Sequence, residues 1–373
     1  MMSQFRVKPT LCQIDSCKAF CEQFEVGKGD LILTNPTYFE GFFDGCADGA
    51  TVVFLKKYGK GEPTDLMVEA LYQDIKDLEY KRVIAIGGGS IIDIAKIIAQ
   101  ETISPVVDLF EKKIPTKKTK ELIIIPTTCG TGSEVTSVSV IELTVRGTKL
   151  GLQTDEEFAD YAVLIPELLE KLPFRFFATS SIDALIHAIE SYLSPKANPF
   201  TEMFSVEAIK LILHGYQEIV AHGEAARNEH IKEFLLASTY AGIAFGNAGC
   251  AAVHAMSMPF SGTYHVPHGE ANYVVFTEVF KVYNRLAPDG KIRILNELLT
   301  SIVGGDGSDV YERLETLLSA ILPKKTLKEY GVKEEELVVF TENVMTKQGR
   351  LTANNYTPLS KEEVYGIYQN LYG

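Results

Sequence analysis

The stretch RVIAIGGGSIIDIAKIIA, residues 82–99, decides the fold class of this chain. Its first part is a short apolar run that predicts a buried strand, and its second part repeats isoleucine at helical spacing. Gly87, Gly88 and Gly89 lie between the two parts. Glycine at a strand-to-helix turn lets backbone N–H groups approach a phosphate, and the helix amino terminus supplies partial positive charge. The stretch therefore predicts one strand–helix unit of an open α/β sheet.

This glycine turn matches neither of the two common nucleotide fingerprints. Ile92 stands where the Gly-x-Gly-x-x-Gly motif requires its third glycine, and no Gly-Lys-Ser/Thr follows as in a Walker A loop. Ser90 and Asp93 have the spacing of a capping box, which predicts that their side chains start the helix. The motif alone leaves phosphate binding and simple strand-to-helix packing equally open.

A second loop of the same kind, PTTCGTGSEVTSVSV at residues 126–140, again follows an apolar strand pattern. Its glycines and hydroxyl side chains are Thr127, Thr128, Gly130, Thr131, Gly132 and Ser133. Ordinary N-capping explains Thr131 with Glu134 but does not explain the whole group. Two such turns at the carboxyl ends of strands suit a ligand in the crevice of an open α/β sheet. Together the two loops predict a site for a nucleotide diphosphate.

The chain divides into two regions with different patterns of apolar residues. In the first region, strands are predicted at residues 29–35, 50–55, 81–87 and 121–128, and helices at residues 64–78 and 90–101. Such alternation is typical of a parallel sheet covered on both faces. In the second region, long helical patterns cover residues 180–194, 204–222 and 230–246. We therefore predict an α/β nucleotide-binding domain at residues 1–172 and an all-helical domain at residues 173–373.

Composition limits the partners. The formal net charge is -13 and the pI is about 5.1, which argues against binding to nucleic acid or to an anionic membrane. The six cysteines include no Cys-x-x-Cys pair and do not form a disulfide framework. The amino terminus lacks the apolar core of a secretion signal, and no apolar run reaches membrane-spanning length. These features predict a cytoplasmic protein with a small-molecule substrate.

The stretch SSIDALIHAIESYLS, residues 180–194, places a carboxylate and an imidazole on an otherwise apolar helix. Asp183 and His187 are four residues apart and therefore point the same way. His254 and His268, from a later passage that holds three of the seven histidines, would complete a set of one oxygen and several nitrogen ligands. That set suits Fe(II) or Zn(II), although buried core histidines are the alternative. The histidines in polar helical stretches are predicted to be solvated: His214, His222 and His230.

Four motifs carry a family resemblance: GGGSIIDIAK, PTTCGTGSEVTSVSV, DALIHAIESYLS and HAMSMPFSGTYHVPHGEAN, in this order. Over nearly its whole length the chain resembles the iron-containing (group III) alcohol dehydrogenases. Through KYGKGEPTD, TYAGIAFGNAG and YHVPHGEANY it is most similar to members that act on 4-hydroxybutyrate. The resemblance implies a dehydroquinate synthase-like fold and reversible, NAD-dependent oxidation of 4-hydroxybutyrate to succinate semialdehyde. It also implies Fe(II), with Zn(II) as the alternative metal, and a homo-oligomer, commonly a dimer.

The resemblance also assigns residues to the site. The implied metal ligands are Asp183, His187, His254 and His268. The cofactor phosphates would lie on Gly88, Gly89 and Ser90. The implied lining of the same cofactor pocket is Asp93, Thr127, Thr128 and Ser133, with Lys149 near the ribose or nicotinamide.

Two positions depart from the family pattern. Many relatives have a further histidine four residues after the third ligand, where this chain has Met258. His265, three residues before His268, is the candidate to replace it or to contact the substrate. Many NAD-preferring relatives have Asp at the end of the strand predicted at residues 29–35, where this chain has Asn35. Asparagine still hydrogen-bonds a ribose but repels a 2′-phosphate less than aspartate, so we expect NAD with weaker discrimination.

Other functions compete with this prediction. The same chemistry on butan-1-ol, propane-1,3-diol or a 1,2-diol is the nearest alternative. A metal- and NAD-dependent carbon–oxygen lyase resembling dehydroquinate synthase would need a cluster of Lys and Arg for a sugar-acid phosphate, and the helical half has none around its histidines. A metallohydrolase lacks support because no His-Glu-x-x-His is present. A non-catalytic nucleotide-binding module would leave the four ligand positions without a purpose. Net release of NADH with an alcohol separates alcohol oxidation from these last three alternatives.

Overall fold

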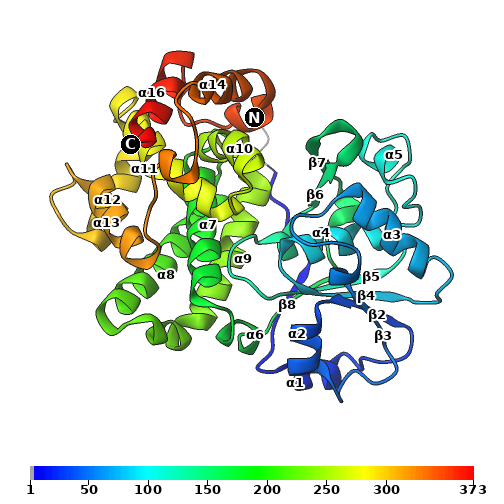
Figure 1. The fold of residues 1–373 in the computed structure, drawn as a ribbon. Helices are drawn as coiled ribbons and strands as arrows, with labels where there is room; N and C mark the ends of the chain where they lie inside the picture. Colours follow the sequence, from blue (N-terminus) through cyan, green and yellow to red (C-terminus); the bar gives the residue numbers. More distant parts are fainter. Residues whose placement is uncertain (1–3) are drawn as a thin grey trace. The chain divides into compact units, whose positions relative to one another are not determined.

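The computed structural model describes residues 4–373 and divides into two compact units (Figure 1). One unit is Val7–Leu172, and the other is Pro173–Gly373 with residues 4–6. The α/β domain expected to begin at residue 1 therefore begins at Val7. The reason is local packing, because the backbone of Arg6 exchanges hydrogen bonds with the Asn247 side chain at 2.7 and 3.0 Å.

The first unit is built on a six-stranded parallel sheet. Its strands, in spatial order, are β1 (Thr10–Gln13), β8 (Tyr161–Leu164), β5 (Glu121–Pro126), β4 (Arg82–Gly87), β2 (Asp30–Thr34) and β3 (Thr51–Phe54). The helices of this unit are α1 (Cys17–Gln23), α2 (Pro36–Tyr38), α3 (Asp65–Ile75), α4 (Gly89–Ile98), α5 (Val106–Phe110) and α6 (Glu167–Glu170). The predicted strands and helices of the first region are thereby confirmed.

Both faces of this sheet are buried, as predicted. On one face the strand residues Leu31, Val83 and Ile124 belong to a core cluster that includes residues of α3, α4 and α5. Side chains of neighbouring strand residues point to the opposite face, and Ile32 and Ile84 there are also fully buried. In Figure 1, α3 and α4 lie on one side of the strands and α1 on the other. Continuous apolar runs such as these are typical of parallel strands covered on both faces.

The prediction missed four short strands. β1 and β8 add one edge of the main sheet, while β6 (Val138–Leu143) and β7 (Thr148–Gln153) form a separate antiparallel pair. β1 and β8 have only four residues each, too few for a clear apolar pattern. In β6 the side chains alternate between buried and half-buried, which reflects one covered face.

The second unit is helical throughout its described residues, which confirms the prediction for this half. Its helices are α7 (Phe174–Leu193), α8 (Pro199–His222), α9 (Ile231–Ala248), α10 (Ala252–Tyr264), α11 (His268–Leu286), α12 (Lys291–Val303), α13 (Val310–Ile321), α14 (Glu336–Lys347), α15 (Gly349–Thr352) and α16 (Lys361–Tyr372). α7 packs against α8, α9 and α11, and every residue from 181 to 193 is buried. A helix buried on all sides is the centre of its unit, so polar groups on α7 face other protein groups and not water.

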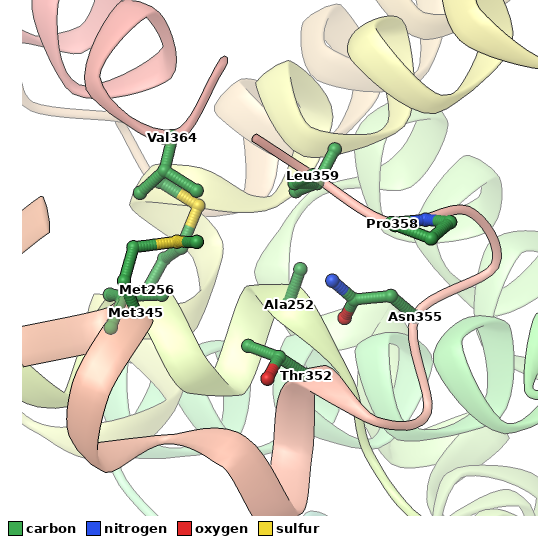
Figure 2. A pocket seen from close by; sticks show the side chains of 9 residues that line it. Ala252, Met256, Met345, Thr352, Asn355, Pro358, Leu359 and Val364 are labelled. Carbon is green, nitrogen blue, oxygen red and sulfur yellow. The ribbon is translucent and has the colours of Figure 1, made fainter. Parts of the chain in front are cut away.

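A small cavity of about 150 Å³ lies between α10, α14 and the chain leading into α16 (Figure 2). Its lining is Ala252, Met256, Val344, Met345, Thr352, Asn355, Pro358, Leu359 and Val364. The lining contains no ionisable side chain. His254 is two residues from Ala252 and therefore lies on about the opposite side of α10, roughly 200° around the helix. The cavity is thus a gap in helix packing and does not belong to the histidine cluster.

Within residues 4–373, no single helix is long and apolar enough to cross a membrane. One bent pair, Glu224–Ala248 with Ala252–Tyr264, meets that length and composition only when its two helices are taken together.

Candidate functional site

The second unit contains a cluster of one carboxylate and three imidazoles: Asp183, His187, His254 and His268. Their candidate ligand atoms all lie within 4.8 Å of one another. Asp183 is at the centre, because its oxygens lie 4.0 Å from His187 Nδ1, 3.9 Å from His254 Nε2 and 4.0 Å from His268 Nε2. The structure therefore brings together all four residues that the resemblance assigned to the metal.

Three helices supply these side chains. α7 carries Asp183 and His187 one turn apart, α10 carries His254 in its first turn, and α11 begins with His268. The imidazoles of His187 and His254 stack with centroids 4.7 Å apart, and Phe245 of α9 also stacks on His187, with centroids 4.2 Å apart. This ring packing limits rotation of His187 and places the cluster inside the helical unit.

The carboxyl group of Asp183 is held in its charged form. Burial tends to raise the pKa of Asp183, but the surrounding histidines and the Asn272 amide hold that pKa below its usual value. Asn272 Nδ2 donates to Asp183 Oδ1 at 2.8 Å and lies 3.1 Å from His268 Nε2. A buried carboxylate beside imidazole nitrogens is the donor arrangement that a divalent cation requires.

The environment of His254 Nε2 supports a metal ion in this cluster. His254 Nδ1 lies 2.6 Å from Glu190 Oε2, and a carboxylate can only accept, so Nδ1 carries the proton. In the neutral ring His254 Nε2 then holds the lone pair, and in the structure this atom is buried and has no hydrogen-bond partner among the described residues. A buried polar atom without a partner is rare and costly, and a cation would satisfy it. Three imidazoles and one carboxylate suit Fe(II) or Zn(II) and leave room for an exchangeable ligand.

The remaining histidines lie outside this cluster. His214 and His222 are exposed and His230 is half-buried, with the rings of His214 and His230 5.6 Å apart. His265 is exposed at the end of α10, with the left-handed backbone angle φ of 52°. A non-glycine residue in this conformation costs about 1–3 kcal/mol and is typical of functional segments. Met258, one turn after His254, is half-buried.

In the first unit, the two glycine-containing loops lie side by side at the carboxyl edge of the sheet. β4 pairs with β5, and Thr127 N donates to Gly87 O at 3.1 Å. A Cβ atom placed on Gly88 would lie 3.4 Å from the Thr128 methyl carbon, so these loops are in contact. Asn35 follows β2, the other neighbour of β4, and therefore lies at the same edge. The predicted phosphate loops thus meet where ligands bind in open α/β sheets.

The predicted capping role of Ser90 and Asp93 is wrong. α4 begins after Gly88, which is the N-cap and offers no side-chain hydrogen bond. The Ser90 hydroxyl donates instead to Gly61 O at 3.1 Å, and Asp93 Oδ2 accepts from Val140 N at 3.1 Å. Asp93 therefore binds α4 to β6, and burial raises the pKa of its carboxyl to about 6.

The second predicted capping pair also has a different arrangement. Gly132, in the left-handed region at φ 57°, precedes a single 3₁₀ turn at Ser133–Val135 without a side-chain cap. The Thr131 hydroxyl accepts from Ser133 N at 3.4 Å, so it closes the loop locally. Lys149 on β7 pairs with Glu62, next to the carbonyl that Ser90 contacts. Ser90 and Lys149 are thus joined through residues 61–62.

Lys96 is a residue of this region that the sequence prediction did not assign. It is fully buried on α4, one turn after Asp93, and its ammonium donates to Val138 O at 2.7 Å and to Thr136 Oγ1 at 3.1 Å. Burial lowers the pKa of Lys96, while Asp93 and Glu157 oppose that shift. Lys96 and Asp93 together hold β6 and the end of the second loop against α4. A lysine inside an apolar helix was the signal that could have found it.

The buried Glu157 carboxyl predicts a distinct pH dependence of stability. Burial raises its pKa from 4.5 to about 7 in the folded protein. Between about pH 4.5 and 7 the folded state then holds more protons than the unfolded state, so stability falls as pH rises. Glu157→Gln removes this titration. As the pH rises from about 4.5 to 7, we therefore expect the Tm of the wild type to fall relative to the Tm of the variant.

Calorimetric Tm values measured at a series of pH values test this expectation. Glu79→Gln, at an exposed position of the same unit, is the matched control and should follow the wild-type curve. Parallel curves for Glu157→Gln and the wild type would show that Glu157 does not titrate in this window.

Comparison with known proteins gives the class. Residues 11–166 match the family "Iron-containing alcohol dehydrogenase", and residues 177–372 match "Fe-containing alcohol dehydrogenase family, C-terminal". The chain belongs to the iron-containing alcohol dehydrogenase family, as the sequence motifs predicted. The fold and the buried donor cluster agree with this class.

The chain is also similar to individual proteins of known name. The chain is 53% identical to the 4-hydroxybutyrate dehydrogenase of Clostridium kluyveri, over 371 residues that cover 100% of both chains. It is 34% identical to long-chain-alcohol dehydrogenase 1 of Geobacillus thermodenitrificans, over 79% of this chain and 75% of that one. Among solved structures, the sulfoacetaldehyde reductase of Bifidobacterium kashiwanohense in complex with NAD+ has a TM-score of 0.87 at 24% identity, covering 100% and 99% of the two chains. At that identity the structural likeness supports the fold alone.

Proposed function

We propose that this protein reversibly oxidises the primary alcohol of 4-hydroxybutyrate to succinate semialdehyde with NAD as the hydride acceptor. The observation that carries the proposal is the 53% identity, along the full chain, with the Clostridium kluyveri enzyme of that name. The buried carboxylate and imidazole cluster supports it, because alcohol oxidation requires a group that stabilises negative charge on the substrate oxygen.

The metal ligands in this proposal are Asp183, His187, His254 and His268. A divalent ion held there would act as a Lewis acid toward the alcohol oxygen. Asp183 contributes the single negative charge of the set, so the loaded site keeps a net positive charge. The histidines contribute neutral nitrogens, and stacking of His187 on Phe245 keeps one of them in place.

The cofactor side of the proposal rests on the two loops of the first unit. Backbone N–H groups near Gly88 and Gly89, at the start of α4, would hold the pyrophosphate. The groups proposed to line the same pocket are Ser90, Asp93, Thr127, Thr128, Ser133 and Lys149. Asp93 would act there through β6, since its carboxylate binds Val140 N. Asn35 would hydrogen-bond the adenosine ribose, and its side chain makes no capping bond to α2.

The overall reaction balances as one alcohol and NAD+ giving one aldehyde, NADH and a proton. NAD held by the two loops would supply the acceptor for the hydride of the carbinol carbon, and the hydroxyl proton would leave to solvent. His265 is the residue we propose to contact the substrate carboxylate. Its exposed imidazole lies three residues before His268, and its backbone conformation holds it at the end of α10.

Initial rates of NADH formation by metal-loaded enzyme test the substrate. We expect 4-hydroxybutyrate to be oxidised with a kcat/KM about 100-fold above that for butan-1-ol, because a paired, desolvated carboxylate contributes a few kcal/mol and each 1.4 kcal/mol is tenfold. His265→Ala should raise KM for 4-hydroxybutyrate while leaving the butan-1-ol rate unchanged.

A second class of substrate is supported by a different relative. The 34% identity with a long-chain-alcohol dehydrogenase favours the same chemistry on an unsubstituted primary alcohol. Equal rates on the two substrates, or a preference for butan-1-ol, would replace the 4-hydroxybutyrate proposal with this one. Unchanged KM in His265→Ala would remove His265 from the substrate site.

We also propose a homo-oligomer, a dimer in the first instance, in the cytoplasm. The resemblance of the sequence to the family supports the dimer, and light scattering of the purified protein measures it. The few cysteines in a long chain, with no Cys-x-x-Cys pair, support a reducing compartment.

A further inference from the structure

Glu190 of α7 is a buried carboxylate with every oxygen occupied. Its side chain is fully buried, and Oε1 accepts from Val253 N at 2.7 Å. Oε2 accepts from Ala251 N at 2.9 Å and lies 2.6 Å from His254 Nδ1. A buried glutamate with these partners connects one metal-ligand helix to the start of another.

We propose that Glu190 is the positioning residue of the metal centre, which it serves by fixing the tautomer and the place of His254. The inference rests on the metal centre proposed above. A carboxylate only accepts hydrogen bonds, so it keeps the imidazole proton on Nδ1 and leaves the lone pair on Nε2. Nε2 is the atom that faces Asp183 Oδ1, at 3.9 Å. Carboxylates behind metal-binding histidines orient the ring in this way and raise its basicity.

The same side chain also determines where α10 begins. α10 starts after Ala251, which has no side chain that could cap the helix. The first N–H groups of a helix lack partners within it. Glu190 accepts from two of these donors, at Ala251 and Val253. The start of α10 is therefore tied to α7, and His254, one residue after Val253, is placed with it.

The spacing along α7 makes this arrangement rigid. Asp183, His187 and Glu190 lie at intervals of four and three residues, so all three project from one face of a single helix. Two direct ligands and the residue that orients a third ligand thus share one backbone segment. α7 therefore sets the spacing between Asp183 and the Glu190 carboxylate that holds His254.

The same atoms allow a different assignment. Glu190, Cys250 and His254 also form a group whose donor atoms lie within 4.8 Å of one another, which could hold an ion of its own. An ion there would have to displace the proton on His254 Nδ1 and compete with two backbone N–H groups for the carboxylate. The hydrogen bonds of Glu190 favour the positioning role, and Cys250 provides a test that separates the two.

The experiment measures the affinity of the apoprotein for Zn(II) and Co(II) by competition with a chromophoric chelator. Glu190→Gln keeps the shape, but only one of its two terminal atoms can accept a hydrogen bond, so it cannot serve Val253 N, Ala251 N and His254 Nδ1 together, and it removes the negative charge behind the imidazole. We expect the affinity to fall about 10–100-fold, as for other residues that orient a metal ligand. Cys250→Ala should leave it unchanged. A loss of affinity in Cys250→Ala would instead support the separate Glu190, Cys250 and His254 site and overturn the proposal.

A role for Glu190 in capping alone predicts another result. Glu190→Gln would then lower the Tm of the apoprotein without changing metal affinity, and this outcome would refute the proposal. His254→Ala distinguishes a failure of the proposed metal centre from a failure of the proposed role of Glu190. If His254→Ala keeps full affinity, the proposed metal centre is wrong. If it loses affinity while Glu190→Gln does not, only the role of Glu190 is wrong.

A measurement on the unmodified protein does not depend on the folding of any variant. Histidine labelled with ¹⁵N in the apoprotein reports the tautomer of each ring, and His254→Ala identifies the signals of His254. The spectra are recorded at a pH where the ring is neutral, because burial tends to lower the pKa of His254 but Cys250 and the Glu190 carboxylate raise that pKa above its usual value. We expect the single proton of the neutral His254 ring on Nδ1. A neutral ring with its proton on Nε2 would contradict the proposal.

Discussion

Asp183→Asn is expected to abolish metal-dependent alcohol oxidation, lowering kcat/KM by at least about a thousandfold. The reason is electrostatic, because Asp183 is the only anionic ligand of the cluster and lies within 4.0 Å of three imidazole nitrogens. A Lewis-acid metal contributes several kcal/mol to alkoxide stabilisation, and about 4 kcal/mol corresponds to a thousandfold in rate. Steady-state rates and metal content of the purified variant measure the effect.

The matched control is His214→Ala, an exposed histidine of the same helical unit that lies outside the cluster. It should keep wild-type activity and wild-type metal content. An Asp183→Asn enzyme that retains both would show that the ion, and the chemistry, are located elsewhere.

Gly269→Ala is expected to damage the same centre through packing alone. A Cβ atom at Gly269, next to His268 on α11, would lie 2.4 Å from Thr179 O and 3.0 Å from Asp183 Cβ of α7. Thr179 O is a backbone atom and cannot rotate out of the way as a side chain could, so α11 must move away from α7. Overpacking of this kind costs about 1–3 kcal/mol of stability. Because His268 moves with α11, we also expect metal affinity to fall at least tenfold, since a displacement of about 1 Å at a reacting site costs roughly a hundredfold in rate.

Gly262→Ala on α10 is the control for this prediction. A Cβ atom there would meet nothing within 4 Å, and helical glycine is replaced by alanine with a gain of about 0.5–1 kcal/mol. Calorimetry and the chelator competition assay measure both variants. A Gly269→Ala protein with unchanged Tm and metal affinity would mean that α7 and α11 are not in close contact at this point.

The local features of this protein could be predicted from its sequence. The apolar run before Gly87 and the isoleucines after it determine a buried strand and an amphipathic helix, because side-chain periodicity acts over a few residues. The helical texture after Pro173 follows from the same rule. The four-residue spacing of Asp183 and His187 places both on one face of α7. The remaining two ligands were reached by resemblance to a family and not by spacing.

The tertiary structure alone decided which distant groups meet. His254 and His268 lie 67 and 81 residues after His187 in the sequence. Packing of α11 on α7 and of α10 on α11 brings the ligand atoms of the cluster within 4.8 Å of one another. Capping-box spacing assigned Ser90 and Asp93 to α4, yet their side chains bind Gly61 O and Val140 N. In the sequence, Glu190 is one polar residue of a helix. Only the structure shows that its carboxylate accepts from N–H groups at the start of α10. Local periodicity cannot encode such contacts, because their energy depends on burial and on the partners that the whole fold supplies.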